Sequence, residues 1–328
     1  MGDKKEVLFS IIIPVYQAKG TLKRCVLSCL DQKYVEDGEM EIILVDDGST
    51  DGSGELCDEL AGEYGLTVVH TGNCGVSHAR NIGIERATGR FVVFVDSDDE
   101  LKDEFLDNCL KYADEGTVLV DETDSYRSTS KISGYGYIEN SILNANTHVW
   151  GKLFSLEALN SGKVRFPEGL TIGEDLIFLL DFALAQEKKR NIRCISMEHY
   201  VYTNNAEGAM NRAFKESYLD QITCWKMAEE RILPAAEFIS PYTLVALATC
   251  QIMTAMLVVE KLAMAGQGKV DKDIAGLAVT QVKEQITHAL KTRGAYAALP
   301  AAHKLKVAVF RISPELYMKL YGRLKGVN

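Results

Sequence analysis

The chain has 328 residues, a formal net charge of −10, 47% hydrophobic residues and 25% charged residues. This composition is that of a globular protein with one large domain or two modest ones. The acidic balance argues against a nucleic-acid partner, because phosphate backbones are bound through basic surfaces.

Eight cysteines are scattered along the chain, with no C-x-x-C pair and no Cys/His zinc spacing. We therefore expect free thiols in a reducing compartment. The first ten residues, MGDKKEVLFS, lack the apolar segment of a signal peptide. These features predict a cytoplasmic protein.

Strands and helices alternate through the first 114 residues. Short apolar runs indicate strands, and longer segments with apolar residues at helical spacing indicate helices. This alternation predicts an α/β fold with a mostly parallel sheet and helices on both faces. The predicted strands are 9–14, 41–45, 67–70 and 91–95, and the predicted helices are 21–32, one ending near 63, 76–87 and 102–114.

Polar clusters follow three of these strands, at 14–17, 46–51 and 96–99. In parallel sheets, ligands bind outside the carboxyl ends of the strands, so we expect the clusters to converge on one crevice. The sequence has no G-x-G-x-x-G after the first strand and no G-x-x-x-x-G-K-[ST]. A Rossmann dinucleotide site is therefore disfavoured and a P-loop is excluded.

The stretch RFVVFVDSDDEL places Asp96, Asp98 and Asp99 directly after an apolar strand. Carboxylates this close repel one another unless a positive group lies nearby. Hard oxygen donors suit Mg²⁺ or Mn²⁺, and Mg²⁺ is usually held by one or two carboxylates together with substrate phosphates. The simpler alternative is a strand that ends in a solvated acidic turn.

Four blocks together resemble the family 2 inverting glycosyltransferases, which have the nucleotide-sugar-binding GT-A fold. The blocks are FSIIIPVY at 9–16, VDDGSTD at 45–51, GVSHARNIG at 75–83 and FVDSDD at 94–99. The resemblance is firm from about 9 to 122 and looser to about 205.

This resemblance implies a donor site for a UDP-sugar. The implied residues are Pro14, Val15 and Tyr16 around the nucleoside, Asp47 at the uracil edge with Asp46 supporting its turn, Arg80 near the nucleotide, Asp96 near the ribose with Ser97 beside it, and Asp98 on the Mn²⁺ or Mg²⁺ that bridges the diphosphate. Two structural alternatives stay open. The segment 46–51 could be only a turn and helix cap, and Tyr16 could be a core residue.

Inverting transfer also needs a general base that takes the proton from the acceptor hydroxyl. The segment Gly173-Glu174-Asp175 precedes a dense apolar run at 176–184. It resembles the E-D motif of the family, which implies Asp175 as the base and Glu174 near the acceptor. Both acids could instead simply begin a helix, where negative charge is favoured.

The segment HVWGKLF at 148–154 resembles the W-x-K-L-F block of the same family. The resemblance implies that Lys152 meets the diphosphate and that Trp150 faces the acceptor sugar. A surface lysine and a core tryptophan are the alternatives.

The last third is predicted to be helical, with helices near 214–233, 242–264 and 274–290 and two shorter ones. Residues 238–259 contain no charge and are long enough to span a membrane. They also contain Pro241 and Gln251 and lack a strongly basic flank, which favours a buried helical hairpin.

Residues 303–328 carry six Lys or Arg side chains against one acid, interleaved with apolar residues. This pattern predicts an amphipathic basic surface that contacts anionic lipid, with an ordinary solvated helix face as the alternative.

We therefore expect three regions: a nucleotide-sugar-binding part at 1–122, an acceptor and base part at 123–205, and a helical part at 206–328. The expected activity is metal-dependent inverting transfer from a UDP-sugar to a saccharide or lipid-linked acceptor. We expect it to act in bacterial surface polysaccharide synthesis at the inner face of the plasma membrane.

Other classes remain open to test. A sugar nucleotidyltransferase would consume a nucleoside triphosphate, and a non-catalytic binding subunit would release no UDP. A phospho-acceptor receiver domain also gathers aspartates at strand ends, but it is far shorter than this chain. The sequence names neither the donor sugar nor the acceptor, and homo-oligomerisation stays open.

Overall fold

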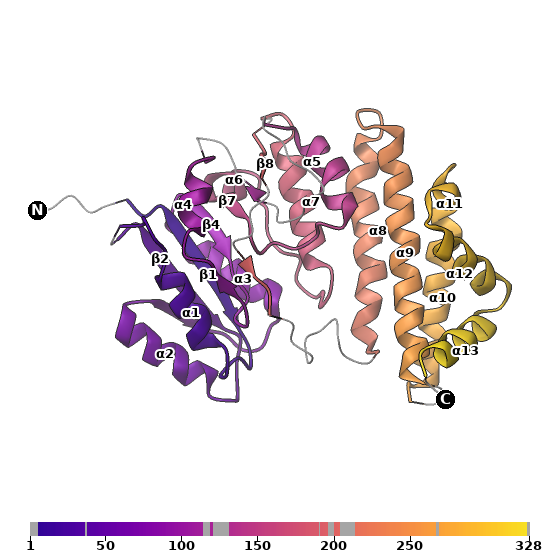
Figure 1. The fold of residues 1–328 in the computed structure, drawn as a ribbon, viewed down its shortest axis with the longest axis horizontal. Coiled ribbons are helices and arrows are strands. Elements are labelled where there is room, and N and C mark those ends of the chain that lie inside the picture. The colour runs from indigo at the N-terminus through magenta and orange to yellow at the C-terminus, as the bar shows by residue number, and fades with distance from the viewer. Residues whose placement is uncertain are drawn as a thin grey trace, which may run out of the picture. The chain divides into compact units, whose positions relative to one another are not determined.

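The computed structural model describes residues 6–36, 38–113, 119–120, 131–189, 191–195, 200–203, 214–266 and 269–326. The chain forms two compact units. The first comprises residues 1–169 and 174–205, and the second comprises 170–173 and 206–328. Figure 1 shows sheets and helices in the first unit and helices alone among the labelled elements of the second.

A five-stranded sheet with the order β3-β2-β1-β4-β7 forms the centre of the first unit. The strands β3, β2, β1 and β4 run parallel to one another, and β7 runs antiparallel to β4. This arrangement confirms the predicted mostly parallel sheet. The strands are β1 (Phe9–Val15), β2 (Met40–Asp46), β3 (Thr67–His70), β4 (Phe91–Phe94) and β7 (Leu153–Ser155).

Because β1 lies between β2 and β4, the carboxyl ends of these three strands are neighbours. The register pairs Val15 with Asp46 across β1 and β2 and Ile12 with Phe94 across β1 and β4. The polar segments that follow the three strands therefore leave the sheet at the same edge.

Helices connect these strands, and two small sheets complete the first unit. The helices are α1 (Leu22–Leu30), α2 (Ser53–Tyr64), α3 (Val76–Arg86), α4 (Phe105–Leu110), α5 (Gly134–Asn140), α6 (Leu156–Ser161) and α7 (Glu174–Gln186), with the 3₁₀ helix η1 (Ile142–Asn144). The small sheets pair β5 (Glu100–Leu101) with β9 (Tyr200–Val201), and β6 (Leu119–Val120) with β8 (Cys194–Ile195).

The segment 121–146 contains α5 and η1 in its second half. Its first part, 121–130, lies outside the described residues. The glycines and tyrosines of α5 are poor helix formers, so the helix depends on its cap and its packing. Ser133 caps it by accepting a hydrogen bond from the Gly136 amide, and α5 packs against α7.

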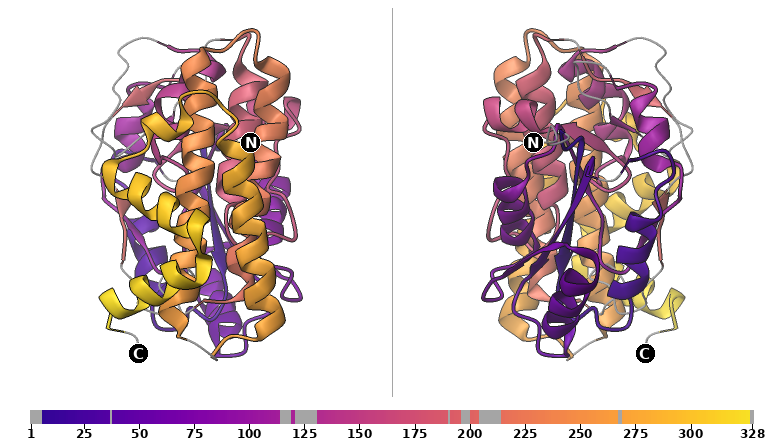
Figure 2. Two further views of the ribbon diagram at one scale, coloured as in Figure 1. Left: turned by 90° about the vertical axis from the view of Figure 1, so that its right-hand side faces the viewer. Right: turned by 90° about the vertical axis from the view of Figure 1, so that its left-hand side faces the viewer.

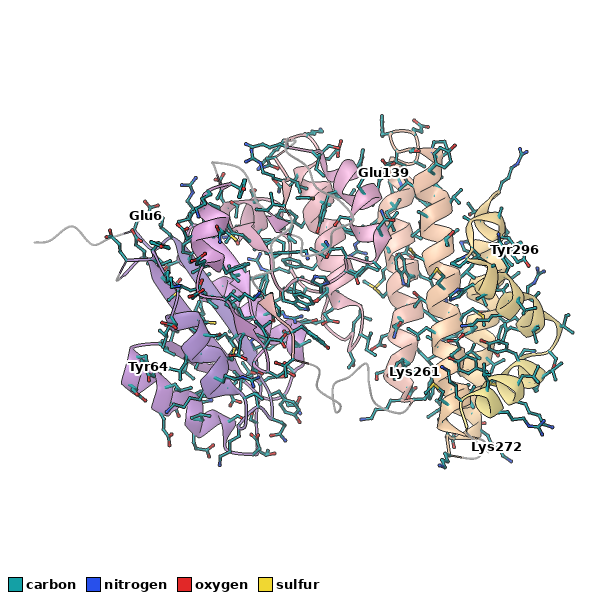
Figure 3. The ribbon with its side chains drawn as sticks, in the orientation of Figure 1. Glu6, Tyr64, Glu139, Lys261, Lys272 and Tyr296 are labelled. Atoms are coloured by element: carbon teal, nitrogen blue, oxygen red, sulfur yellow. The ribbon has the colours of Figure 1, made fainter. Side chains whose placement is uncertain are left out.

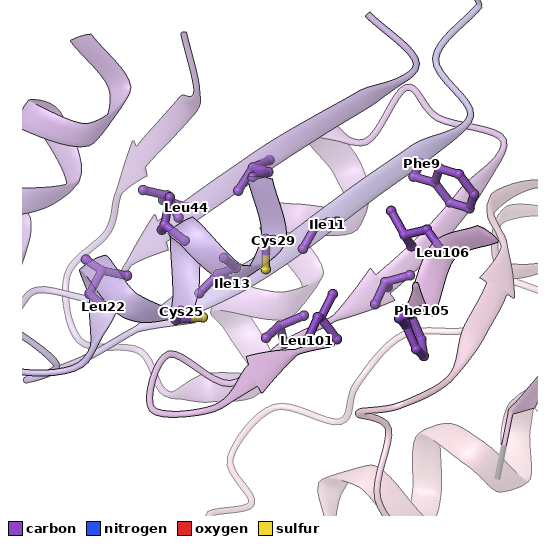
Figure 4. Packing of buried hydrophobic residues seen from close by; sticks show 14 of the residues in the cluster. Phe9, Ile11, Ile13, Leu22, Cys25, Cys29, Leu44, Leu101, Phe105 and Leu106 are labelled. Atoms are coloured by element: carbon purple, nitrogen blue, oxygen red, sulfur yellow. The ribbon is translucent and has the colours of Figure 1, made fainter. Parts of the chain in front are cut away.

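The strand β1 is buried over its whole length. Phe9, Ile11 and Ile13 point to one face, where they join a core with residues of α1 and α4 (Figure 4). On the other face Ile12 packs closely on Gly83 of α3, since a β-carbon there would lie 2.3 Å from Ile12 Cγ2. Burial on both faces explains the continuous apolar run, and each buried side chain contributes roughly 1.5–3 kcal/mol.

The second unit is built around one long helix, α9 (Pro241–Ala265), which packs against the other helices of the unit. Half of its most apolar stretch is buried, although its length and composition would suffice to cross a membrane. The remaining elements are η2 (Glu216–Leu219), α8 (Asp220–Ile232), η3 (Leu233–Ala235), α10 (Lys272–Ala289), α11 (Ala295–Ala298), α12 (Ala301–Ile312) and α13 (Pro314–Leu324).

Within this unit, α12 and α13 lie on the opposite side of α9 from α8 (Figures 1 and 2). Glu260 of α9 is buried and accepts hydrogen bonds from Lys306 at 2.7 Å and from the Tyr317 hydroxyl at 2.8 Å. Tyr296 of α11, labelled in Figure 3, donates its hydroxyl to the carbonyl of Lys304. These bonds fix the last helices to the core of the unit.

Two glycines of α5 provide a test of the close packing between α5 and α7. A β-carbon on Gly134 would lie 1.8 Å from the carbonyl oxygen of Ala183, whereas one on Gly136 would lie 3.6 Å from its nearest neighbour. We expect Gly134→Ala to lower the free energy of unfolding by roughly 1–3 kcal/mol. Gly136→Ala should leave it unchanged or raise it by up to about 1 kcal/mol, because Ala favours helix. Urea unfolding measures both, and equal effects would contradict the packing described here.

Candidate active site

The first predicted group, Pro14, Val15 and Tyr16, lies at the end of β1. The Val15 side chain is buried in the core, and its carbonyl accepts a hydrogen bond from the Asp47 amide at 2.8 Å. Tyr16 is half-exposed, and its hydroxyl accepts a hydrogen bond from Asn73 Nδ2 at 3.2 Å. The core alternative for Tyr16 is therefore wrong, and Val15 offers a ligand only its backbone.

Asp47 is buried and holds the loop that leads into α3. Its Oδ1 accepts hydrogen bonds from the Cys74 amide at 2.7 Å and the Thr71 hydroxyl at 2.9 Å, and its Oδ2 accepts one from the Gly75 amide at 2.7 Å. These three bonds use most of the about four acceptor positions of a carboxylate. If a uracil base binds here, its edge would hydrogen-bond to the Asp47 carboxylate, which already holds this loop.

Asp46 supports the turn after β2. Its Oδ1 accepts a hydrogen bond from the Ser49 amide at 3.1 Å, and its Oδ2 lies 3.0 Å from His70 Nδ1. Burial acts to raise the pKa of the Asp46 carboxyl, but the hydrogen bonds from Ser49 and His70 outweigh it and lower that pKa. The pKa of His70 is raised by its hydrogen bonds to Asp46 and Asp58.

The acidic turn after β4 separates into carboxylates with different surroundings. Asp99 is buried and accepts hydrogen bonds from the Tyr200 hydroxyl at 2.8 Å and the Thr203 amide at 2.7 Å. Burial outweighs these bonds and raises the pKa of Asp99 to about 6. Ser97 and Asp98 are partly exposed, and the Asp98 carbonyl accepts a hydrogen bond from Arg24 at 3.0 Å. Asp99 thus anchors β9, while Asp98 stays accessible.

Within the described ranges, no group of three or more His, Cys, Asp or Glu side chains could hold a metal ion. Mg²⁺ or Mn²⁺ does not require such a cage when a diphosphate completes its coordination. Asp98 is a partly exposed carboxylate beside Asp96, and both supply the hard oxygen donors that these ions prefer. The residues at this turn therefore fit a divalent cation that arrives with a nucleotide.

Arg80 of α3 joins the donor side of the site to the segment that contains the predicted base. Its Nη2 donates to Asp96 Oδ1 at 2.9 Å, and its Nη1 donates to Asp175 Oδ1 at 2.8 Å and to Glu174 Oε1 at 3.2 Å. The guanidinium is almost fully buried and lies over the ring of Phe166, 5.1 Å from its centroid. One cation thus faces three carboxylates from two distant parts of the chain.

This cluster shifts the pKa values of its members. Burial acts to lower the pKa of Arg80, but Asp175, Asp96 and Glu174 outweigh it and raise that pKa. Burial, followed by the charge of Asp175, raises the pKa of Glu174 to about 7. Burial also raises the pKa of Asp175, although Arg80 opposes the shift.

Asp175 is held in one orientation at the start of α7. Its Oδ1 bonds Arg80, and its Oδ2 accepts a hydrogen bond from the Val149 amide at 3.2 Å. Its side chain keeps 17% of its surface exposed, so an acceptor hydroxyl can reach it. A carboxylate that is fixed, mostly buried and of raised pKa has the properties of a general base.

Lys152 is fully buried, and its Nζ donates to Asn146 Oδ1 at 2.8 Å. The surface-lysine alternative is therefore wrong. The ammonium is also not exposed to a diphosphate in this structure, contrary to the role that the resemblance implies. Its charge acts instead on Asp175, where it opposes the rise in pKa, and on His148.

Trp150 lies in a stack of aromatic rings. Its ring is 3.7 Å from His148, 4.5 Å from Tyr200 and 5.8 Å from Tyr202, measured between centroids, with interplanar angles of 18°, 19° and 22°. Tyr202 is exposed, so the stack reaches the surface. Burial, followed by the charge of Lys152, lowers the pKa of His148 to about 2 and keeps its ring neutral. Flat apolar faces of this kind suit a sugar ring.

Sequence reasoning did not identify Tyr200, Tyr202 or His148 as neighbours of Trp150. The alternation of side chains in an extended chain was the available signal, since it would place Tyr200 of β9 and Tyr202, the residue after β9, on one face. Their contact with Trp150 depends on the pairing of β9 with β5, which no local pattern encodes.

Residues 10–157 match glycosyl transferase family 2. The chain is 27% identical over 236 residues to the uncharacterized glycosyltransferase YibD of Escherichia coli K12, covering 64% of this chain and 67% of YibD. It is 29% identical over 220 residues to the minor teichoic acid biosynthesis protein GgaB of Bacillus subtilis 168, covering 62% of this chain but 24% of GgaB.

Solved structures share the fold. TarS 1–349 of S. aureus superposes with a TM-score of 0.67 at 19% identity, covering 97% of this chain and 90% of TarS 1–349. Its complex with UDP-GlcNAc gives 0.63 at 18% identity, covering 98% and 93%. The mannosyltransferase PcManGT of Pyrobaculum calidifontis, in complex with GDP-Man and Mn²⁺, gives 0.54 at 18% identity, covering 88% and 87%.

The sheet order, the carboxylates at its edge and these likenesses define a glycosyltransferase with the GT-A fold. Residues 10–157 form a glycosyl transferase family 2 domain. The predicted fold class, family and enzyme class are confirmed.

The raised pKa of Glu174 predicts a pH-dependent stability. Its folded-state pKa of about 7 lies above its ordinary value of 4.5, so the folded state holds the proton more tightly. The resulting stabilisation is complete below about pH 4.5 and is lost as the pH rises through 7. Glu174→Gln removes this loss. We therefore expect the free energy of unfolding of the variant, relative to wild type, to increase by on the order of 1 kcal/mol when the pH is raised from 5 to 8. Thermal unfolding at both pH values measures the gain.

The same substitution at Glu157, an exposed glutamate in the first turn of α6, is the matched control for the chemical change itself. A Glu174→Gln variant whose stability follows the pH exactly as wild type does would contradict the assignment.

Proposed function

We propose that the enzyme transfers a sugar, with inversion, from a UDP-sugar to a hydroxyl group of a saccharide or lipid-linked acceptor. The observation that carries this proposal is the bridge at Arg80, which bonds Asp96 at 2.9 Å and Asp175 at 2.8 Å. The bridge brings the acidic turn after β4, where the donor would bind, next to a buried carboxylate suited to proton removal. Inverting transfer requires these two functions in one site.

On the donor side, Tyr16 would stack on the base and the Asp47 loop would hold the nucleoside. The UDP-GlcNAc complex of TarS, which shares the fold, supports a UDP-sugar as donor. The name of GgaB supports a role in building a cell-surface polymer. Both observations concern other proteins, so the identity of the donor and the role in building a polymer are proposals for this enzyme.

In the proposed reaction, Asp175 takes the proton of the acceptor hydroxyl while that oxygen attacks the anomeric carbon. The Val149 amide and Arg80 keep the carboxylate in place. The stack that contains Trp150 would hold the acceptor sugar beside it. Positioning of this kind lowers the entropic part of the activation barrier, because the reacting groups are already held in a reactive geometry.

Asp98 would hold the divalent cation, and the Mn²⁺ in the complex of PcManGT supports metal dependence. When bound, such a cation offsets the negative charge that develops on the leaving diphosphate. Mn²⁺ and Mg²⁺ both fit the oxygen donors of the turn.

A cytoplasmic location, at the inner face of the plasma membrane, is also proposed. The eight free cysteines, six of them buried, support a reducing compartment. A lipid-linked acceptor would require access to the membrane.

The direct test is a screen of UDP-sugars for thermal stabilisation of the enzyme in the presence of Mn²⁺, followed by measurement of UDP release from the best donor. We expect at least one UDP-sugar to stabilise the enzyme and to yield UDP. A preference for nucleoside triphosphates, or binding without UDP release from any donor and acceptor, would overturn the proposal.

The role of Asp175 is tested by Asp175→Asn, which keeps the shape of the side chain and removes its basicity. We expect UDP release to fall by roughly 10²- to 10⁴-fold with nucleotide affinity unchanged. Asp31→Asn, at an exposed position after α1, is the control. Near-normal turnover by the Asp175 variant would show that another group is the base.

The role of Asp98 is tested by Asp98→Ala in calorimetric titrations with UDP and Mn²⁺. We expect the Mn²⁺-dependent part of the UDP affinity to be lost, because the variant lacks the protein ligand of the cation. Chelation of the metal in wild type should give the same result. An unchanged affinity in the variant would refute the metal role.

A further inference from the structure

The last two helices of the second unit expose large apolar side chains. These side chains form what we name the outer stripe, and their exposed fractions are 68% for Leu305, 81% for Ile312, 47% for Leu316, 50% for Leu320 and 80% for Leu324. Single exposed leucines are ordinary on protein surfaces, but a row of them on adjoining helices indicates a binding surface.

The spacing of the outer stripe follows the helix period. Leu316, Leu320 and Leu324 recur every four residues on α13 and therefore share one face. Tyr317 and Tyr321 of the same helix pack into the core of the unit. The helix α13 thus has two apolar faces, and the packing of the unit covers the one that carries the tyrosines.

The helix α12 repeats this arrangement. Val307 and Phe310 are buried, whereas Leu305 and Ile312, two turns apart, point outward. Figures 1 and 2 show α12 and α13 on the same side of α9 and α10. The two helices also pack against each other, and each carries part of the outer stripe.

Positive charge accompanies the outer stripe. Arg311, Lys319, Arg323 and Lys325 are exposed, and Lys319 and Arg323 lie at helical spacing between the leucines of α13. Glu315 is the acidic residue in this stretch, and it accepts a hydrogen bond from the Ser313 hydroxyl at the start of α13. In a chain of net charge −10, this local excess of basic residues opposes the overall balance.

We infer that α12 and α13 bind the surface of an anionic lipid bilayer. The outer stripe would enter the boundary between headgroups and acyl chains, and the flanking Arg and Lys side chains would reach the lipid phosphates. A two-fold contact with a second copy fits less well, because it would place these basic residues against themselves. The inference deepens the proposed membrane location and does not depend on the transferase chemistry.

Vesicle flotation of the full chain tests this inference. We expect binding to vesicles that contain phosphatidylglycerol, at least about tenfold weaker binding to pure phosphatidylcholine, and loss of binding at high salt. The variant Leu320→Gln/Arg323→Glu, which changes the middle of the stripe on α13, should bind anionic vesicles about 10- to 100-fold more weakly.

The matched control is Leu233→Gln/Lys226→Glu, which alters an exposed leucine and an exposed lysine on the α8 side of α9. Thermal unfolding shows whether each variant is folded. If the wild-type protein releases UDP, neither double variant should change the rate of that release. The inference would be overturned if the wild-type protein remained in the fraction that does not float with the vesicles. It would also be overturned if the α13 variant and the wild-type protein floated equally. If the wild-type protein formed a dimer that the α13 variant lost, and neither bound vesicles, the outer stripe would instead be a contact between two copies.

Discussion

The buried charge cluster at Arg80 is the interaction on which the site depends. A guanidinium without water around it requires compensating charge, and Asp96, Glu174 and Asp175 supply more than it needs. The position of Arg80 is itself fixed, because Asn81 exchanges two hydrogen bonds of 2.9 Å with the backbone of Phe166, whose ring lies under the guanidinium. The end of β4 and the start of α7 meet because both bond to one side chain of α3.

The cluster has more negative charge than positive charge, and this excess affects the pKa values of its carboxylates. Burial raises the pKa values of Glu174 and Asp175, and the neighbouring carboxylates add to the rise because one cation does not balance three negative charges. The same excess makes the neighbouring turn attractive to a divalent cation and its diphosphate. The excess of negative charge therefore favours proton uptake by the cluster.

The sheet could be read from the sequence, but the contacts around the site could not. Apolar runs located β1, β2 and β4 to within about two residues, because strands covered on both faces largely exclude polar side chains. The family resemblance named Arg80, Asp96, Glu174 and Asp175 separately, but it did not indicate the bonds that join them. Lys152 was assigned to the diphosphate although it is buried against Asn146, and the tyrosines beside Trp150 were missed. These contacts join residues 6 to 95 positions apart or depend on β9, so packing determines them, not local periodicity.

The buried carboxylate of Asp99 has a consequence for how this enzyme can change its acceptor. It bonds Tyr200 and Thr203, the Asp96 amide also donates to the Tyr200 hydroxyl, and Tyr200 stacks on Trp150, so the aromatic stack is attached to the turn after β4. Substitutions around Trp150 can therefore reshape the proposed acceptor surface while Asp96 and Asp98 keep their places, provided that Asp99 and Tyr200 are retained. The proposed acceptor surface and the proposed donor site are therefore separate groups of residues that meet at Asp99 and Tyr200.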